Sequence, residues 1–208
     1  MSPDLYLAFL LATTIALVVP GPTILLVISC ALAHGRSITL ALTSGVVLGD
    51  LIAMSVTLAG LGAILAASAT VFTAMKWVGA LYLAWMGWRM IRDSRTASAS
   101  LQTFGQRPGS AAFRDGFVVT LLNPKSIGFF IAFVPQFVDA SRPVIPQFLL
   151  MIVTFVGLGG ISVLAYALLA ARLRGRLTRP GAMAWLQRAG GVVLIGLAAF
   201  TLTLRRAA

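Results

Sequence analysis

The sequence carries few charges and few of the residues that form metal and redox sites. Of its 208 residues only 10% are charged, whereas an ordinary soluble domain is about 25% charged. The single Cys30 excludes an intrachain disulfide or a dithiol redox pair, and the single His34 excludes a site of several histidines. Because 59% of the residues are hydrophobic, we expect an integral membrane protein that uses neither a metal nor another cofactor.

Acidic residues are especially scarce: five aspartates and no glutamate stand against 16 lysines and arginines, a formal net charge of +11. A balance this basic can indicate nucleic-acid binding. Here, however, the basic residues cluster between apolar runs, and no stacking aromatics alternate with them. We therefore interpret the positive charge as a topology signal and as contact with anionic membrane lipid, and we expect no nucleic-acid partner.

Six apolar segments are long enough to cross a membrane as helices, which takes about 20 residues. They cover 5–33, 39–62, 70–90, 116–138, 145–171 and 184–204. We expect an all-α fold of one membrane domain, 1–208, with a first three-helix half (1–92), a basic cytoplasmic linker (93–114) and a second three-helix half (115–208). An odd number of spans in each half makes the two halves inverted repeats.

Two of these segments are interrupted by proline. Pro20-Gly21-Pro22 lies within the first span, and Asn123-Pro124 lies within the first span of the second half. Proline removes a backbone donor and clashes with the preceding helical turn, so we expect both helices to be broken there. Broken helices at corresponding places in inverted halves indicate a transporter's central site; the alternative is a simple kink in each span.

Two charged residues fall deep inside the spans, where ionisable groups are costly and indicate a functional site. At about 1.5 Å per residue, Asp50 and Lys125 lie about 15–17 Å from the cytoplasmic ends of their spans, near the middle of a hydrocarbon core about 30 Å thick. Opposite charges at one depth are expected to pair. The alternative is a purely structural ion pair that locks two helices together.

The expected site suits a zwitterion. Helix N-termini at Pro22 and Pro124 place partial positive charge at the cavity, where they attract a carboxylate. Lys125 adds a full positive charge, Asn123 offers hydrogen bonds, and Asp50 can accept an ammonium group or carry a proton. A carboxylate and an ammonium group held together describe an amino acid.

The basic residues also predict the orientation. The loops after the first, third and fifth spans carry eleven lysines and arginines, the opposite side carries four, and Lys125 is left within a span. Basic loops stay on the cytoplasmic side. We therefore expect both termini outside the cytoplasm.

Glycines recur within three of the expected helices, as Gly45-x-x-x-Gly49, Gly157-x-Gly159-Gly160 and Gly190-Gly191. Small residues let membrane helices approach closely. For the last two groups we expect helix packing rather than a binding role.

The motifs resemble those of the LysE/RhtB-type amino-acid exporter family over essentially the whole chain. The resemblance rests on Pro20-Gly21-Pro22 with the following LLVISCALAHGR, on Gly45 to Asp50, and on FRDGFVVTLLNPKSIGFFIAFVPQF. It implies export of amino acids or close derivatives across the bacterial inner membrane in exchange for protons. The functional positions implied by the resemblance are Pro20, Gly21, Pro22, Asp50, Asn123, Pro124 and Lys125.

Other function classes fit the residues less well. An exporter or channel for another small solute, an organic anion or a metal ion, is the alternative, although relatives that handle metals or electrons need histidine-rich or paired-cysteine features that are missing here. A membrane enzyme is not expected, because no set of nucleophile, histidine and acid falls within the spans. A structural or assembly protein would need Asp50 for stability but not for transport. A homodimer is compatible with so small a transporter.

Overall fold

The computed structural model describes residues 1–34, 36–67, 69–96, 108–139, 141–172 and 181–203, and nearly all of them are helical. The elements, in chain order, are α1 (Pro3–Val18), α2 (Pro22–Ala33), α3 (Arg36–Ala67), α4 (Ala69–Arg92), the short 3₁₀ helix η1 (Asp93–Thr96), α5 (Gly109–Leu121), α6 (Pro124–Ala132), the 3₁₀ helix η3 (Val134–Phe137), α7 (Val144–Arg172) and α9 (Ala182–Thr203).

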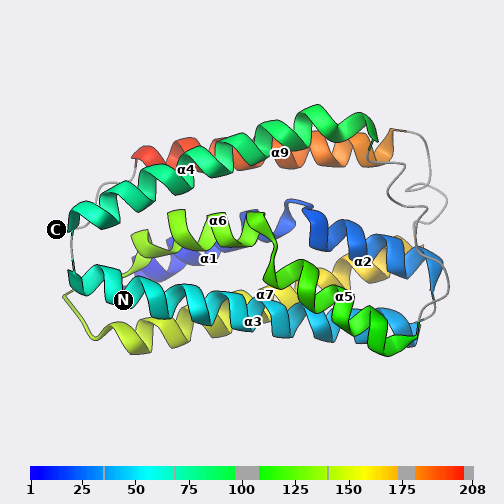
Figure 1. The fold of residues 1–208 in the computed structure, drawn as a ribbon, viewed down its shortest axis with the longest axis horizontal. Helices are drawn as coiled ribbons and strands as arrows, with labels where there is room; N and C mark the ends of the chain where they lie inside the picture. Colours follow the sequence, from blue (N-terminus) through cyan, green and yellow to red (C-terminus); the bar gives the residue numbers. More distant parts are fainter. Residues whose placement is uncertain (35, 68, 97–107, 140, 173–180, 204–208) are drawn as a thin grey trace.

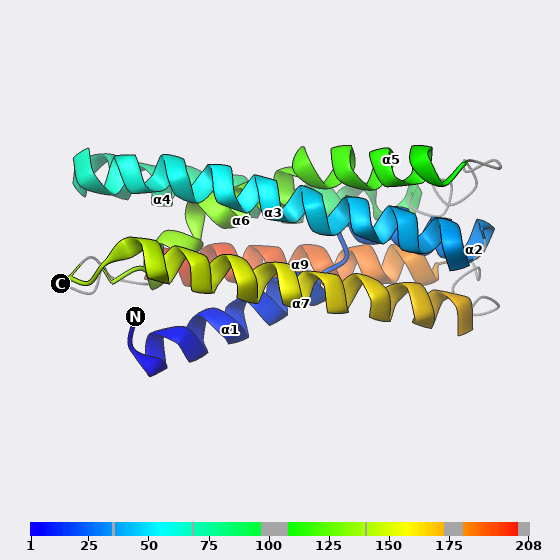
Figure 2. The same cartoon turned by 90° about the horizontal axis from the view of Figure 1, so that it is seen from below.

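The helices run along one long axis (Figure 1). The start of α1 and the end of α9 lie at the same end of the bundle, whereas α5 begins and α7 ends at the opposite end; the view turned by 90° agrees (Figure 2). The pairs α1–α2 and α5–α6 each cover the length of the bundle in two pieces, in opposite directions (Figure 1). The expected all-helical fold is therefore present.

Two of the described helices are by themselves long and apolar enough to cross a membrane, over Arg36–Gly60 and Val144–Ala170. The pair α1–α2 meets the same criteria if taken as one span, and its two parts are bent by 51°. The helices are interrupted at both places where the sequence predicts a break, after Val18 and after Leu121.

Helical structure extends into both ends of the segment 93–114, which the sequence analysis interprets as a linker. Asp93–Thr96 form η1, and α5 already begins at Gly109, directly after Pro108; Ala111 and Ala112 in its first turn favour helix. One of them, Ala112, is buried. Residues 97–107 lie outside the part of the chain that the structure describes.

Glycines allow two helix pairs to pack with their backbones in contact. On α3, a Cβ at Gly45 would collide with the Phe113 carbonyl of α5, and one at Gly49 would lie 2.9 Å from the Phe117 carbonyl. On α4 and α9, Gly87 and Gly191 each lie against the other's carbonyl. The packing role expected for Gly191 is confirmed, and the same reason explains the glycines of α3.

Two apolar clusters fill the interior and follow each other along the long axis of the bundle. The larger is rich in phenylalanine, with Phe9, Phe130 and Phe133 fully buried, and joins α1, α6 and η3 to the neighbouring helices. The smaller joins α2 to α5 and to one end of α3 and α7, through residues such as Val27 and Leu42. A group of buried polar side chains lies between the clusters, at the level of the two helix breaks: Thr23, Asp50, Asn123 and Lys125.

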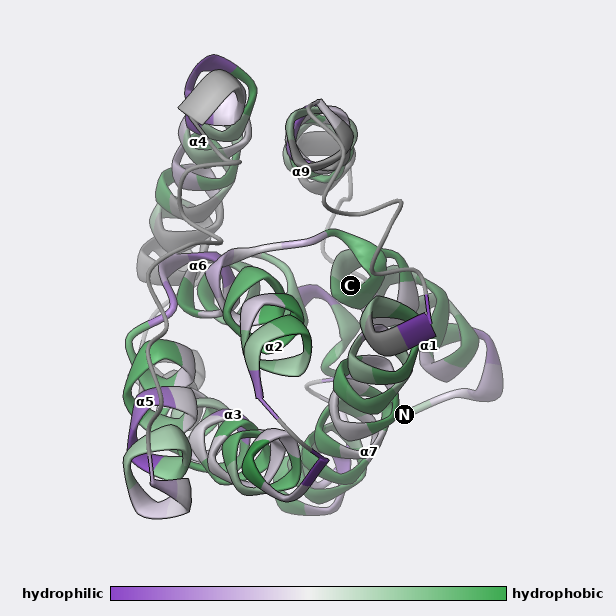
Figure 3. Cartoon of the chain, turned by 90° about the vertical axis from the view of Figure 1, so that its right-hand side faces the viewer, coloured by the Kyte–Doolittle hydropathy of each residue, from purple (hydrophilic) through white to green (hydrophobic). Residues whose placement is uncertain are grey.

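Helices α4 and α9 form an outer pair. The view along the bundle shows them together on one side, with α2 at the centre of the other helices (Figure 3). The pair contacts the rest of the chain mainly through α6, where Tyr82 lies against Gly128, and also at the first helix break, where Gly190 of α9 lies against Val19 and Pro20.

We predict that Gly45→Ala destabilises the protein. Its methyl group would meet the Phe113 carbonyl, which is backbone and cannot rotate away, so that overpacking should cost about 1–3 kcal/mol. The measurement is the thermal unfolding midpoint of the purified protein in detergent.

The matched control is Gly157→Ala, also within a long apolar helix, where a Cβ meets no atom within 4 Å. It should leave the midpoint unchanged or raise it, since alanine favours helix over glycine by about 1 kcal/mol. Equal midpoints for the two variants would show that α3 and α5 are not held in backbone contact.

Candidate functional site

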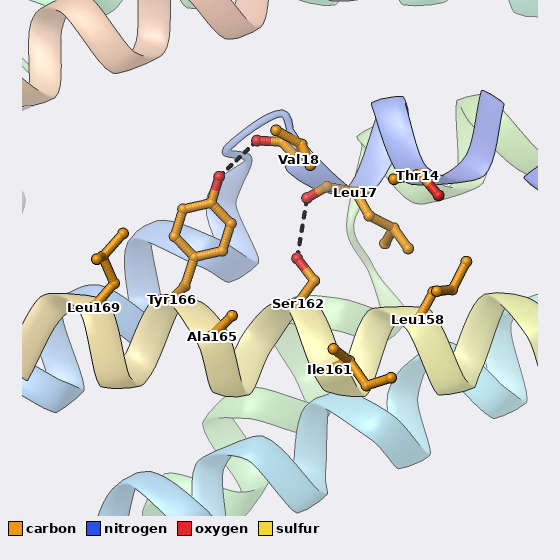
Figure 4. A pocket seen from close by; sticks show the side chains of 9 residues that line it. All are labelled: Thr14, Leu17, Val18, Leu158, Ile161, Ser162, Ala165, Tyr166 and Leu169. Atoms are coloured by element: carbon orange, nitrogen blue, oxygen red, sulfur yellow. Dashed lines mark hydrogen bonds between the residues drawn. The ribbon is translucent and has the colours of Figure 1, made fainter. Parts of the chain in front are cut away.

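The first helix break leaves the last carbonyl groups of α1 without helical partners. Its cause is local: Pro20 and Pro22 flank Gly21, which adopts an extended conformation as the N-cap of α2. Two of the exposed carbonyls bond to α7, as Figure 4 shows. The Ser162 hydroxyl donates to the Leu17 carbonyl at 3.4 Å, and the Tyr166 hydroxyl donates to the Val18 carbonyl at 2.6 Å. The second half of the chain thus supports the break in the first.

The second helix break is organised by Asn123. Its side-chain oxygen accepts a hydrogen bond from the Lys125 backbone N–H at 3.0 Å, which caps α6, and Pro124 occupies the first helical turn. The same side chain donates from Nδ2 to the Thr23 hydroxyl at 3.0 Å, and that hydroxyl lies 3.3 Å from the hydroxyl of Thr120. One amide therefore caps α6 and ties it to the first turn of α2.

Lys125 crosses from the second break to the first. Its Nζ donates to the carbonyl of Val19, the third consecutive carbonyl at the end of α1 to receive a side-chain donor. The aliphatic part of the lysine lies along Gly21, where a Cβ would stand 3.0 Å from Lys125 Cδ. Because Gly21 has no side chain, the buried Lys125 side chain can lie against it.

Asp50 lies at the middle of α3, between the two apolar clusters, and is only 6% exposed. On α7 the residue that faces it is Gly159, where a Cβ would lie 3.2 Å from Asp50 Oδ2. Gly159 therefore lies where α7 packs on α3, and its missing side chain also leaves room for the carboxylate. Gly157, by contrast, has no neighbour within 4 Å of a Cβ and carries no packing contact among the described residues.

Asp50 and Lys125 border one cavity of about 40 Å³. Among the described residues no ion pair within 4 Å joins them, and the lysine instead uses the Val19 carbonyl. The cavity has room for ordered water but not for an amino acid, since one water takes about 30 Å³ in the liquid. The two charges thus face one small polar space without direct contact.

Four of the residues singled out in the sequence border this space: Gly21, Asp50, Asn123 and Lys125. The three prolines, Pro20, Pro22 and Pro124, border a second cavity of about 310 Å³, which also touches Gly21. The structure thus gathers all seven residues around two adjoining cavities.

Sequence reasoning missed Thr23, Ser126, Gly159 and Ser162, which also border the smaller cavity. Thr23 and Ser126 directly follow the two proline motifs and could have been found as polar residues in first helical turns. Ser162 has no such signal, because serine is common in membrane helices. Within the described residues, no three histidine, cysteine or acidic side chains gather closely enough to hold a metal ion.

The structure is that of a helical membrane protein whose long helices surround a buried polar centre. The chain belongs to the LysE type translocator family, whose model matches residues 14–205. No solved structure matches it.

Relatives cover nearly the whole chain. A protein of Vibrio cholerae described as an uncharacterized membrane protein is 33% identical over 94% of this chain and 95% of its own. A homoserine/homoserine lactone efflux protein of Salmonella typhimurium is 31% identical over 100% of both chains. A leucine efflux protein of Klebsiella pneumoniae is 28% identical over 96% of this chain and 95% of its own.

We predict that Asn123→Ala destabilises the protein by about 1–3 kcal/mol, because it removes both the cap of α6 and the bond to Thr23. The matched control is Ser126→Ala, which removes a hydroxyl from the same cavity without breaking a hydrogen bond between described residues. Unfolding midpoints in detergent should fall for the first variant and stay close to wild type for the second. A larger loss in Ser126→Ala would contradict the assigned role of Asn123.

Proposed function

We propose that this translocator exports amino acids or close derivatives from the bacterial cytoplasm in exchange for protons, by alternating access. The observation that carries the proposal is a buried carboxylate and a buried ammonium group, on Asp50 and Lys125, bordering one cavity between two broken helices. The relatives described as leucine and homoserine efflux proteins support the same substrate class.

In the proposed site the substrate carboxylate lies near Lys125 and the N-termini of α2 and α6, which begin at Pro22 and Pro124. Helix N-termini stabilise anions through their unpaired N–H groups and the helix dipole. Asp50 accepts the substrate ammonium group. The Asn123 amide, together with Gly21, keeps the two helix ends close enough to act on one ligand.

The cavity of about 40 Å³ is an occluded form of this site. Small-ligand pockets span about 300–1,000 Å³, so the site must widen before it can take an amino acid. The elements that would move are the half-helices, because residues 19–21 and 122–123 interrupt their backbone hydrogen bonding. Alternating access would then expose the site to one side of the membrane at a time.

Proton coupling would arise because the Lys125 ammonium group has two possible partners, the Val19 carbonyl and the Asp50 carboxylate. In the structure its ammonium group is bound to the Val19 carbonyl, with Asp50 across the cavity. An ionised Asp50 attracts both that group and a substrate amine, and a protonated Asp50 attracts neither strongly. Uptake of a proton at Asp50 would therefore release the substrate, and loss of the proton would restore the site.

The proposal includes the topology. α1–α2 and α5–α6 each form one broken crossing, and α3, α4, α7 and α9 form four more, which gives two inverted halves of three crossings. The basic loops then lie in the cytoplasm, and both termini lie outside. Large apolar side chains exposed along α7, such as Ile145, Val153 and Ile161, suit contact with lipid or with a second copy in a homodimer.

We predict that proteoliposomes loaded with labelled leucine or homoserine export the label faster when protons can flow inward. Asp50→Asn should reduce this gradient-stimulated rate by about tenfold or more, because it removes the group that exchanges the proton. Lys125→Met should reduce transport with and without the gradient, because it removes both the positive charge and the bond to Val19.

Asp4→Asn is the matched control, since Asp4 is an exposed aspartate in the first turn of α1. It should export at the wild-type rate. Folding of each variant is checked by size-exclusion chromatography. If folded wild-type protein exports no amino acid, or if Asp50→Asn keeps the full gradient stimulation, the proposed mechanism fails.

A further inference from the structure

The cavity of about 310 Å³ is much larger than the central one, and the two adjoin at Gly21. It lies between the outer pair α4–α9 and the helices α2 and α6; Figure 3 shows the separation of the outer pair. Its inner end is formed by the two helix breaks, and its outer end by Arg89 and Asp93, where α4 gives way to η1. Its volume reaches the lower end of the range of small-ligand pockets, about 300–1,000 Å³.

One wall of this cavity is apolar, and the packing of Tyr82 against α6 and Trp85 fixes its position. Tyr82, Trp85 and Met86 contribute from α4, and Leu25 contributes from α2. The rings of Tyr82 and Trp85 lie 5.6 Å apart, and Tyr82 is fixed from behind by α6, where a Cβ at Gly128 would lie 2.6 Å from Tyr82 Cδ1. Such a wall suits a large apolar side chain rather than a small or charged one.

The outer end carries two opposite charges in loose contact. Arg89 Nε lies 3.5 Å from Asp93 Oδ2, whereas Arg92 Nε holds the other oxygen of Asp93 at 2.8 Å. The hydrogen bond from Arg92 lowers the pKa of Asp93, which favours the ionised carboxylate. The Arg89 guanidinium lies over the Trp85 ring, 5.3 Å from its centroid, which aims it along the cavity wall.

We propose that this cavity is the receiving site for a zwitterionic amino acid with a large apolar side chain, which binds its carboxylate to Arg89 and packs its side chain against Trp85 and Met86. The ammonium group replaces Arg89 at Asp93, so the ligand exchanges one long contact for two charge-assisted ones. This proposal rests on the proposed function and adds to it where the substrate is first bound and selected. From there the ligand needs to pass only Gly21 and the Lys125 side chain to reach the central site.

The chain supplies a control for each key residue. Trp88, one turn beyond Trp85 on α4, is exposed and does not border the cavity. Arg114 on α5 is exposed, pairs with Asp115 at 3.9 Å and does not border the cavity. Variants of these two report the general effect of losing a tryptophan or an arginine, whereas Arg92 is left unchanged because it holds Asp93.

The experiment measures equilibrium binding of radiolabelled L-leucine to the purified full-length protein, with unlabelled L-leucine, L-leucinamide and glycine as competitors. Arg89→Gln and Trp85→Ala should each weaken leucine binding by about tenfold, whereas Arg114→Gln and Trp88→Ala should stay within about twofold of wild type. Wild type should prefer leucine to leucinamide, which lacks the carboxylate, and Arg89→Gln should lose that preference. Because the competitor comparison within wild type needs no variant, misfolding cannot hide the result.

Export is then measured with the same proteins, which separates the two proposals. If leucine binds through Arg89 and Trp85 but wild type exports no amino acid, the proposed function fails and the receiving site stands. If wild type exports leucine and the two cavity variants bind it as tightly as wild type does, the receiving site is overturned and the exporter stands. Absence of leucine binding to folded wild type also overturns the receiving site.

Discussion

The hydrogen bond from the Lys125 ammonium group to the Val19 carbonyl is the interaction around which this structure is organised. In lipid a helix can be interrupted only where protein groups or trapped water satisfy its free backbone atoms. At the end of α1 those groups come from the other half of the chain, from Ser162, Tyr166 and Lys125. In return, Thr23 of the first half accepts a hydrogen bond from Asn123 at the second break, so hydrogen bonds between the halves join the two breaks.

The apolar interior consists of two clusters, and the polar centre lies between them. On α3, Asp50 separates Val46 of one cluster from Ala53 of the other, and on α7 the small residue Gly159 lies between Phe155 and Val163 in the same way. Backbone contact at Gly45 and between Gly87 and Gly191 brings the helices close without bulky side chains. Close packing on both sides of the centre keeps bulk water out, and charges interact more strongly there than in water.

In the proposed mechanism the two adjoining cavities have different roles. The smaller holds the charges that can exchange a proton, and it is too small for a substrate in this form. The larger has the size, the apolar wall and the charged outer end that suit an amino acid. Gly21 borders both, so a movement of the α1–α2 break would act on the two spaces together. A larger residue there would meet Lys125 directly.

The sequence by itself determined that the chain is helical and membrane-embedded, where its helices break, and which charges lie deep within it. These follow from local properties: the length of apolar runs, the missing N–H of proline and the cost of a charge in lipid. The length of α5 was missed because Gly109–Arg114 precede the apolar run that begins at residue 116, and only tertiary packing brings them against α3. Only the tertiary structure decided that Lys125 binds a backbone carbonyl instead of pairing with Asp50, that Gly159 makes room for a carboxylate, and that Arg89 and Trp85 border a cavity. The physical reason is that these contacts join residues far apart in the chain, and their partners are set by how the helices pack.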